Sequence, residues 1–178
     1  MGEIQIAIIG QSGVINTPLQ ELAYQIGKEI AIRKGILLSG GRDGVMEAAC
    51  RGAKDAGGTT VGILPGNDKN EGNSFLDVSI TTGLDFDYRS LILIHSCDAV
   101  IMLGGRNGTL NELSAAYLNN KPIVVLKGST GWSDRIQTFA YRGKYLDDRE
   151  NQAIEYADNP REAVEKAFSQ AQFAAGII

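Results

Sequence analysis

Short apolar segments alternate with segments of helical periodicity along the whole chain. Val, Ile and Leu dominate the segments that we predict as β-strands, which are residues 4–9, 36–39, 60–64, 78–81, 99–103, 122–126 and 153–156. Apolar residues recur at helical spacing in the segments that we predict as helices, which are residues 17–34, 45–56, 86–96, 108–119, 133–141 and 159–173. The long polar stretch at residues 65–74 is predicted to be a surface loop.

This alternation predicts an α/β fold. Strands that are separated by helices of this length form βαβ units, which build a parallel sheet with helices on both faces. Strands that are buried on both faces are nearly continuous aliphatic runs, as these are. No linker, repeat or low-complexity segment interrupts the pattern. We therefore predict one Rossmann-like domain over residues 1–178, with α/β/α layers around a mainly parallel sheet of about six or seven strands.

Two of the predicted helices begin with capping sequences. Thr17-Pro18-Leu19-Gln20 has the form of a capping box, with Thr17 as the cap and Pro18 at the first helical position. Asn159 followed by Pro160 predicts a similar start for the last helix.

Charge and composition exclude several classes of function. The chain has 17 Lys and Arg residues against 21 Asp and Glu residues, for a formal net charge of −4. Nucleic acids and anionic membranes bind concentrated positive charge, so we expect neither as a partner. The sequence has no apolar stretch of about 18 residues and no basic, cleavable leader, so we expect a cytoplasmic protein.

Cysteine and histidine are scarce. Cys50 and Cys97 are the two cysteines, and His95 is the single histidine. These residues cannot form a disulfide framework or a His/Cys zinc cluster. We therefore expect a reduced protein with no metal site.

Glycine is abundant, with 22 residues, many of them in clusters that follow predicted strands. Three such loops, at residues 10–16, 40–44 and 104–109, lie at the carboxyl ends of strands, where parallel sheets bind their ligands. Glycine lets backbone N–H groups approach an anion, and the helix that follows contributes its dipole. A phosphate-bearing ligand is expected, although any one of these loops could instead be a tight turn. Neither the Walker A pattern nor GxGxxG is present, which argues against an ATPase or a classical NAD site.

Two of these loops resemble motifs of the Lonely Guy (LOG) family. Residues 39–47, SGGRDGVME, resemble its GGG-x-x-GLM segment, and residues 104–112, GGRNGTLNE, resemble its PGGxGTxxE motif. Arg89 precedes Asp98 by nine residues, as the motif arginine of the family precedes an aspartate. The resemblance implies a Rossmann-like homo-oligomer that binds a nucleoside 5′-monophosphate and hydrolyses its N-glycosidic bond. Members have been labelled lysine decarboxylases, but no Schiff-base site is apparent in this chain, and we do not expect that activity.

The chain also departs from the LOG pattern. Gly104 replaces the motif proline, Arg106 replaces its second glycine, and Phe86-Asp87-Tyr88 stands before Arg89 in place of a Met-His sequence. The segments GGRDGVMEA, FDYRS and GWSDR are more similar to a neighbouring branch that contains the molybdenum cofactor carrier proteins. The resemblance therefore leaves two functions open: a phosphoribohydrolase, or a non-enzymatic carrier or sensor of molybdenum cofactor or another phosphorylated ligand. Neither function requires a resident cofactor.

The motif positions supply the candidate site residues. The resemblance implies that Glu112 and Arg89 are catalytic. The expected phosphate and nucleotide contacts are Gly40, Gly41, Gly44, Gly104, Gly105, Arg106, Asn107, Gly108 and Thr109, and additional ligand contacts are expected at Ser12, Gly13 and Asp43.

Several of these residues also have simpler explanations. Glu112 could complement only the helix N-terminus, and Arg89 could form a surface ion pair with Asp85 or Asp87. Arg106 could add phosphate affinity or could fill the site. Asp43 could accept from a ribose hydroxyl or act as an ordinary acid at a helix start. The sequence leaves these alternatives open.

Overall fold

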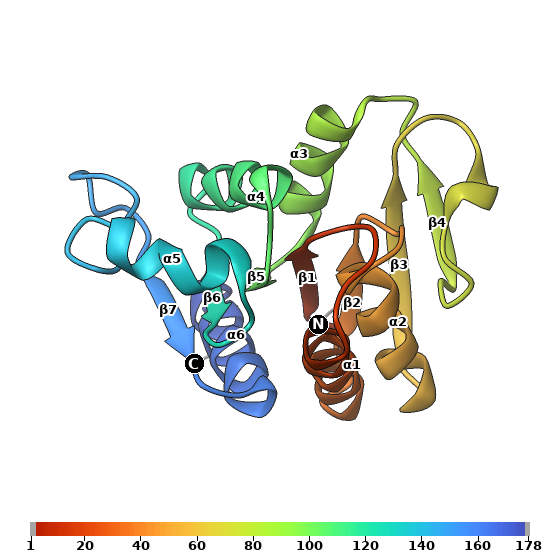
Figure 1. Cartoon of the computed structure of the whole chain (residues 1–178), viewed down its shortest axis with the longest axis horizontal. Coiled ribbons are helices and arrows are strands. Elements are labelled where there is room, and N and C mark those ends of the chain that lie inside the picture. The colour runs from red at the N-terminus through yellow and green to blue at the C-terminus, as the bar shows by residue number, and fades with distance from the viewer. Residues whose placement is uncertain (1–2, 177–178) are drawn as a thin grey trace.

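Seven strands form one parallel sheet at the centre of the protein in a computed structural model, which describes residues 3–176 (Figure 1). The strand order across the sheet is β4-β3-β2-β1-β5-β6-β7. The strands are β1 (Gln5–Gly10), β2 (Ile36–Ser39), β3 (Thr59–Leu64), β4 (Val78–Thr81), β5 (Ala99–Leu103), β6 (Ile123–Leu126) and β7 (Ile154–Ala157). The prediction of a mainly parallel sheet is confirmed, with β4 and β7 at its edges.

Helices cover both faces of this sheet, which confirms the three-layer prediction (Figure 1). One face packs against α1 (Thr17–Ile32), α2 (Val45–Asp55) and α6 (Pro160–Ala174). The other face packs against α3 (Phe86–Ser96), α4 (Asn107–Leu118) and α5 (Gly131–Phe139). No helix within residues 3–176 is long and apolar enough to cross a membrane.

The strand order places a crevice above the centre of the sheet. From β1 the chain adds β2, β3 and β4 in one direction, and it then returns to add β5, β6 and β7 on the other side of β1. Ligands of open α/β sheets bind at such a switch point, outside the carboxyl ends of the strands. Gly10 pairs in register with Leu103, so the loops after β1 and β5 begin side by side. The loop after β2 leaves the sheet next to them, because β2 pairs with β1.

The cap of α1 differs from the prediction. Asn16, not Thr17, is the N-cap, and its Oδ1 atom accepts a hydrogen bond of 2.9 Å from the backbone N–H of Leu19. Thr17 is the first helical residue and Pro18 the second. An asparagine Oδ1 atom reaches the orphan N–H groups as well as a threonine hydroxyl does, so the chain caps one residue earlier. The predicted Asn159 cap of α6 is confirmed, with an Oδ1 contact of 2.9 Å to the N–H of Glu162.

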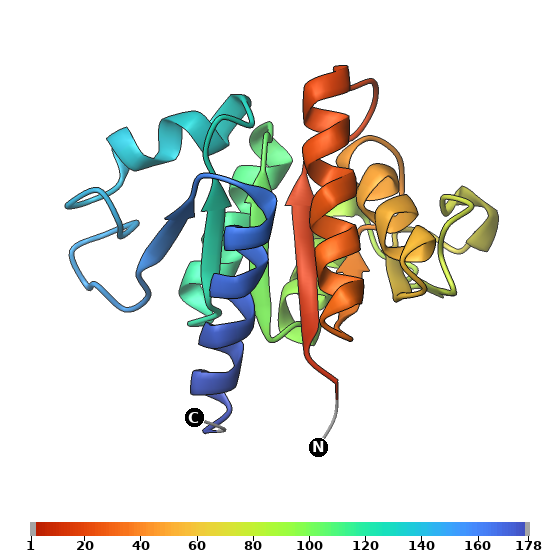
Figure 2. The same cartoon turned by 90° about the horizontal axis from the view of Figure 1, so that it is seen from below.

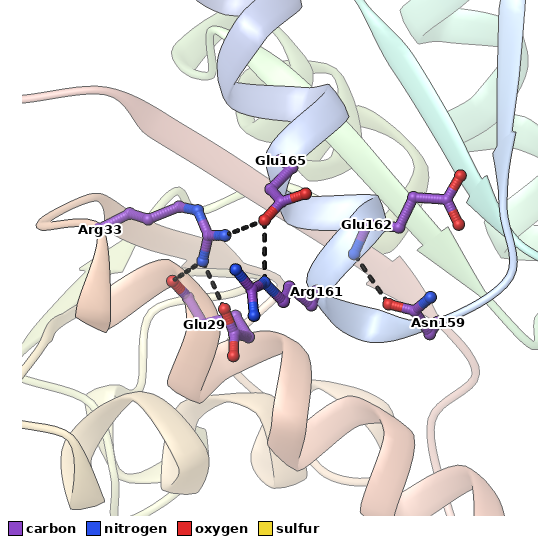
Figure 3. Close-up of polar contacts among 6 residues, drawn as sticks. All are labelled: Glu29, Arg33, Asn159, Arg161, Glu162 and Glu165. Carbon is purple, nitrogen blue, oxygen red and sulfur yellow. Dashed lines mark hydrogen bonds and ion pairs between the residues drawn. The ribbon is translucent and has the colours of Figure 1, made fainter.

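Helices α1 and α6 lie side by side on one face and are joined by ion pairs (Figure 2, Figure 3). Arg33 at the end of α1 contacts Glu165 on α6 at 2.9 Å and also pairs with Glu29 in its own helix. Arg161 contacts the same Glu165 oxygen at 2.9 Å. Ion pairs with this much solvent exposure contribute about 0–1 kcal/mol each, so the network orients the two helices more than it stabilises them.

The polar stretch at 65–74 is a loop except for one turn of 3₁₀ helix, η1 (Lys69–Glu71). The Asn73 side-chain amide donates to the carbonyl oxygens of Gly41 at 3.2 Å and Arg42 at 2.9 Å. The loop is therefore attached to the turn after β2.

The aliphatic run in α3 is buried on one side only. Leu93 and Ile94 are fully buried, whereas Leu91 and Ile92 are 40% and 36% exposed in the single chain. A run that is apolar around the whole helix predicts burial on both sides, and a partner subunit would cover the outer side. The inner contact is confirmed, and the homo-oligomer remains a prediction.

The two cysteines provide a test of the core. Burial raises the pKa of Cys50 to about 11 and that of Cys97 to about 12. Because the thiolate is the reactive form, we expect neither thiol to react with an aromatic disulfide reagent in the native protein at neutral pH. Both thiols should react after unfolding in guanidinium chloride, as absorbance of the released thiolate will show. Rapid labelling of either thiol in the native protein would contradict the burial of that part of the core.

Candidate functional site

A cavity of about 140 Å³ lies above the carboxyl ends of the central strands, between α3 and α4. Six of the predicted site residues line it: Ser12, Arg89, Arg106, Gly108, Thr109 and Glu112. A further seven residues line the cavity without having been predicted as site residues: Gly10, Gln11, Arg42, Met46, Phe86, Asp87 and Ser90. Three of them, Gln11, Arg42 and Ser90, directly adjoin a predicted residue along the chain, and this was the sequence signal for them.

Arg89 and Glu112 face each other inside the cavity. The Arg89 Nη1 atom lies 3.6 Å from Glu112 Oε1, and the two residues are only 5% and 9% exposed. Asp85 and Asp87 form no ion pair with Arg89, so the alternative of a surface ion pair is wrong. Burial lowers the pKa of Arg89, while the charge of Glu112 opposes that shift.

Arg89 has unused hydrogen-bonding capacity. Its Nε and Nη1 atoms are buried and have no hydrogen-bond partner among the described residues. A buried charged donor without an acceptor is costly, and a guanidinium is well shaped to bind two oxygens of a phosphate. The arrangement therefore favours an anionic ligand at Arg89.

Gly40 makes room for that guanidinium. A Cβ atom on Gly40 would lie 2.3 Å from Arg89 Nη1 and 2.8 Å from the Met46 sulfur. Gly40 was predicted to contact phosphate through its backbone. That contact stays a prediction, and the structure adds that the absence of a side chain at Gly40 is what Arg89 requires.

Glu112 shares a hydrogen-bonded chain with α3. Ser90 Oγ lies 2.9 Å from Glu112 Oε1 and 3.0 Å from the carbonyl oxygen of Phe86. The single hydroxyl hydrogen serves one of these acceptors at a time, and a protonated Glu112 could donate to Ser90 while Ser90 donates to Phe86. Burial raises the pKa of Glu112, and both Arg89 and the Ser90 hydroxyl oppose the shift. The carboxyl group is therefore suited to hold or release a proton in this cavity.

The glycine loop before α4 is held from behind by α5. The backbone N–H groups of Trp132 and Ser133, at the start of α5, donate to the carbonyl oxygens of Gly105 at 3.2 Å and Gly104 at 3.0 Å. Gly104 and Gly105 have φ angles of +63° and +108°, which glycine adopts without strain. The first N–H groups of α4, at Asn107, Gly108 and Thr109, have no carbonyl partner within the helix and are available for an anion.

Two serines complete this support. Ser129 Oγ accepts from the Gly104 N–H at 3.0 Å, and Ser133 Oγ donates to the Gly104 carbonyl at 2.9 Å. Both serines are buried. The GWSDR segment, residues 131–135, had no function predicted from the sequence, and in the structure its Ser133 holds the glycine loop before α4 in position.

The other predicted loop residues connect the first two loops instead of lining the cavity. Asp43 Oδ1 accepts from the Gly13 N–H at 2.9 Å, and a Cβ on Gly44 would lie 2.5 Å from the Gln11 carbonyl oxygen. Gly41 packs against β3, with Gly62 Cα 3.0 Å from where its Cβ would be. Gly13 and Gly44 face a separate cavity of about 250 Å³ on the α1–α2 side of the first loop.

Arg42 closes the cavity on the side of β3. Its Nη1 atom lies 2.5 Å from Glu71 Oε2, and its guanidinium carbon lies 5.4 Å from the centre of the Phe86 ring. The residue thus joins the turn after β2, the loop at η1 and the start of α3.

No group of three or more His, Cys, Asp or Glu side chains within residues 3–176 is arranged to hold a metal ion. The chemistry available at the cavity comes from three arginines, two carboxyl groups, hydroxyl groups and the amides of α4.

Comparisons with known proteins show the family of the chain. The sequence profile of the SLOG cluster4 family matches residues 3–164. A cytokinin riboside 5′-monophosphate phosphoribohydrolase from Mycobacterium tuberculosis is 31% identical over 134 residues, which are 70% of this chain and 71% of that protein.

Two solved structures extend the similarity over almost the whole chain. The molybdenum cofactor binding protein of Rippkaea orientalis superposes with a TM-score of 0.82 and 34% identity, covering 95% of this chain and 98% of that one. The molybdenum cofactor carrier protein of Chlamydomonas reinhardtii gives a TM-score of 0.81 and 30% identity, with the same coverage.

Proposed function

The chain belongs to the SLOG cluster4 family, within the LOG-like superfamily and near its molybdenum cofactor carrier branch. On this premise we propose that the protein binds a nucleoside 5′-monophosphate by its phosphate and hydrolyses the N-glycosidic bond. Buried Arg89, with two guanidinium nitrogens that have no hydrogen-bond partner among the described residues, is the observation that carries the proposal. A phosphate beside α4 would accept from Arg89 and from the N–H groups at the start of that helix.

Glu112 is the residue that we propose acts at the ribose. It lies one helical turn beyond Thr109, so a ligand with its phosphate at the loop would direct its sugar towards the carboxyl group. As a carboxylate, Glu112 would orient a water molecule and accept its proton while the water oxygen bonds to the anomeric carbon. The bond from that carbon to the base breaks, and its electron pair goes to the base, which takes up a proton from solvent. Glu112 returns the proton of the water molecule to solvent, and the products are free base and ribose 5-phosphate.

A second candidate function is binding without chemistry. In this proposal the protein carries molybdenum cofactor or another phosphorylated ligand, and the same arginines and amides hold the phosphate. The two structures of molybdenum cofactor proteins support it, because each covers 95% of the chain. Arg106, which stands in place of a motif glycine, is a further difference from the phosphoribohydrolase pattern.

A chromatographic assay separates the two proposals. Purified protein is incubated with a panel of nucleoside 5′-monophosphates, and free base and ribose 5-phosphate are quantified. Release of both products in equal amounts supports the hydrolase and identifies its base. Binding of nucleotides without release supports the carrier, and mass spectrometry of the copurifying ligand then tests it. A protein that neither binds nor cleaves any member of the panel and retains no phosphorylated ligand would contradict both.

A further inference from the structure

We infer that the ligand of this site carries a second anionic group besides its phosphate, an inference that rests on the proposed phosphate site. The observation is that three guanidinium groups line the same small cavity and come from three different elements. Arg42 lies in the turn after β2, Arg89 lies in α3, and Arg106 is the N-cap residue of α4.

Acidic residues pair with two of these three arginines. Asp87 and Glu112 are the two acids among the lining residues, and Glu112 Oε1 lies 3.6 Å from Arg89 Nη1. Arg42 pairs with Glu71, but Glu71 lies outside this cavity. Within residues 3–176, Arg106 forms no ion pair and no side-chain hydrogen bond. Among the described residues, Arg106 is therefore the arginine of the cavity whose charge has no acidic partner.

A single phosphate uses only part of this set. Buried Arg89 has two nitrogens without a hydrogen-bond partner among the described residues, and the first N–H groups of α4 have no partner within the helix, so these groups suffice to hold one phosphate. Arg106 immediately precedes those N–H groups, and its exposed side chain lines the cavity beside them. Arg42 faces the cavity from the loop on the opposite side of the central strand. A second anionic group next to the first would meet Arg106 from one side and Arg42 from the other.

The chemical class is thus a small phosphorylated compound with two anionic groups. The groups can be adjacent, as in a diphosphate ester, or on either side of a sugar, as in a bisphosphate. ADP and adenosine 3′,5′-bisphosphate represent these arrangements, and AMP represents a single phosphate. Dissociation constants for the three compounds are measured by calorimetry at constant ionic strength, because charge–charge affinity depends on salt.

The decisive variant is Arg106→Gln, with Arg135→Gln as the matched control. Arg106 is exposed and caps a helix through its backbone, so its replacement leaves the fold intact. Arg135 is an exposed arginine of α5 that does not line the cavity, so its variant removes the same charge elsewhere.

We expect the wild-type protein to bind ADP or the bisphosphate at least about tenfold more tightly than AMP. This is the gain in affinity that one charged hydrogen bond from an arginine to the second anionic group provides. Arg106→Gln should weaken the binding of ADP or the bisphosphate more than that of AMP, so that this ratio falls to about threefold or less, and Arg135→Gln should preserve the ratio. Equal wild-type affinity for all three compounds would overturn the inference and leave the proposed phosphate site standing. Equal weakening of AMP and ADP in Arg106→Gln would also overturn it, because Arg106 would then serve the first phosphate. Absence of binding by all three compounds would remove both the inference and the proposed nucleotide function.

Discussion

Replacing Glu112 by Gln is expected to lower nucleotide hydrolysis by about 100- to 10,000-fold, the range found when a positioned acid or base is removed. The amide keeps the size of the side chain and can still accept from Ser90, which lies 2.9 Å from Glu112 Oε1. It cannot accept a proton from water. Nucleotide affinity should stay the same or increase, because the variant removes a negative charge beside Arg89 and the phosphate. Turnover is measured as released base, and affinity by calorimetry.

Glu47→Gln is the matched control. Glu47 lies in the first turn of another helix that follows a glycine loop, and it faces the separate cavity on the α1–α2 side. The same substitution there should leave turnover within about twofold of wild type, as is usual away from the reacting atoms. If Glu112→Gln retains wild-type release of base, Glu112 has no part in the reaction.

The pH dependence of hydrolysis follows from the burial of Glu112. Desolvation raises the pKa of this carboxyl group, against the effects of Arg89 and Ser90. Below the raised pKa the group holds a proton and cannot accept one from water. Turnover by the carboxylate should therefore fall as the pH is lowered, and the fall should begin at a higher pH than an ordinary glutamate would give. A profile that instead rises as the pH is lowered would assign Glu112 as a proton donor.

Replacing Gly27 by Ala is expected to destabilise the fold by about 2 kcal/mol. A Cβ on Gly27 would lie 1.9 Å from the Ala49 carbonyl oxygen, and a Cβ on Gly52 would lie 1.9 Å from that of Tyr24, so α1 and α2 cross backbone to backbone. Separating them costs about 3 kcal/mol, at the upper end of overpacking effects. The better helix propensity of alanine returns about 1 kcal/mol. For a chain of this size, the net change lowers Tm by about 4–8 °C in a calorimetric scan.

Gly108→Ala provides the control for this prediction. Gly108 lies in α4, and no atom is within 4 Å of where its Cβ would be. We expect its Tm to equal or exceed that of wild type, because alanine is the better helix former. If Gly27→Ala melts at the same temperature as Gly108→Ala, the close crossing of α1 and α2 is wrong.

The sequence by itself determined the order of the elements and the end of the sheet where the ligand site lies. Strands such as Ala99–Leu103 are buried on both faces, so their aliphatic runs are visible without any knowledge of their neighbours. Glycine clusters that follow such strands mark the carboxyl end of the sheet, where helix N-termini converge. These signals are local, and each one can be read within a short stretch of chain.

Only the tertiary structure decided how the site residues act. The sequence offered Asp85, Asp87 or a ligand as partners for Arg89, whereas folding places Glu112 from the neighbouring helix against it. The sequence likewise gave no sign that Gly40 makes space for the Arg89 guanidinium. The close packing at Gly27 could not be predicted from the sequence either, because the carbonyl group that it contacts, that of Ala49 in α2, is 22 positions away along the chain. Contacts between elements depend on how helices pack across a sheet, and a local pattern of residues does not predict the distance between side chains of different elements.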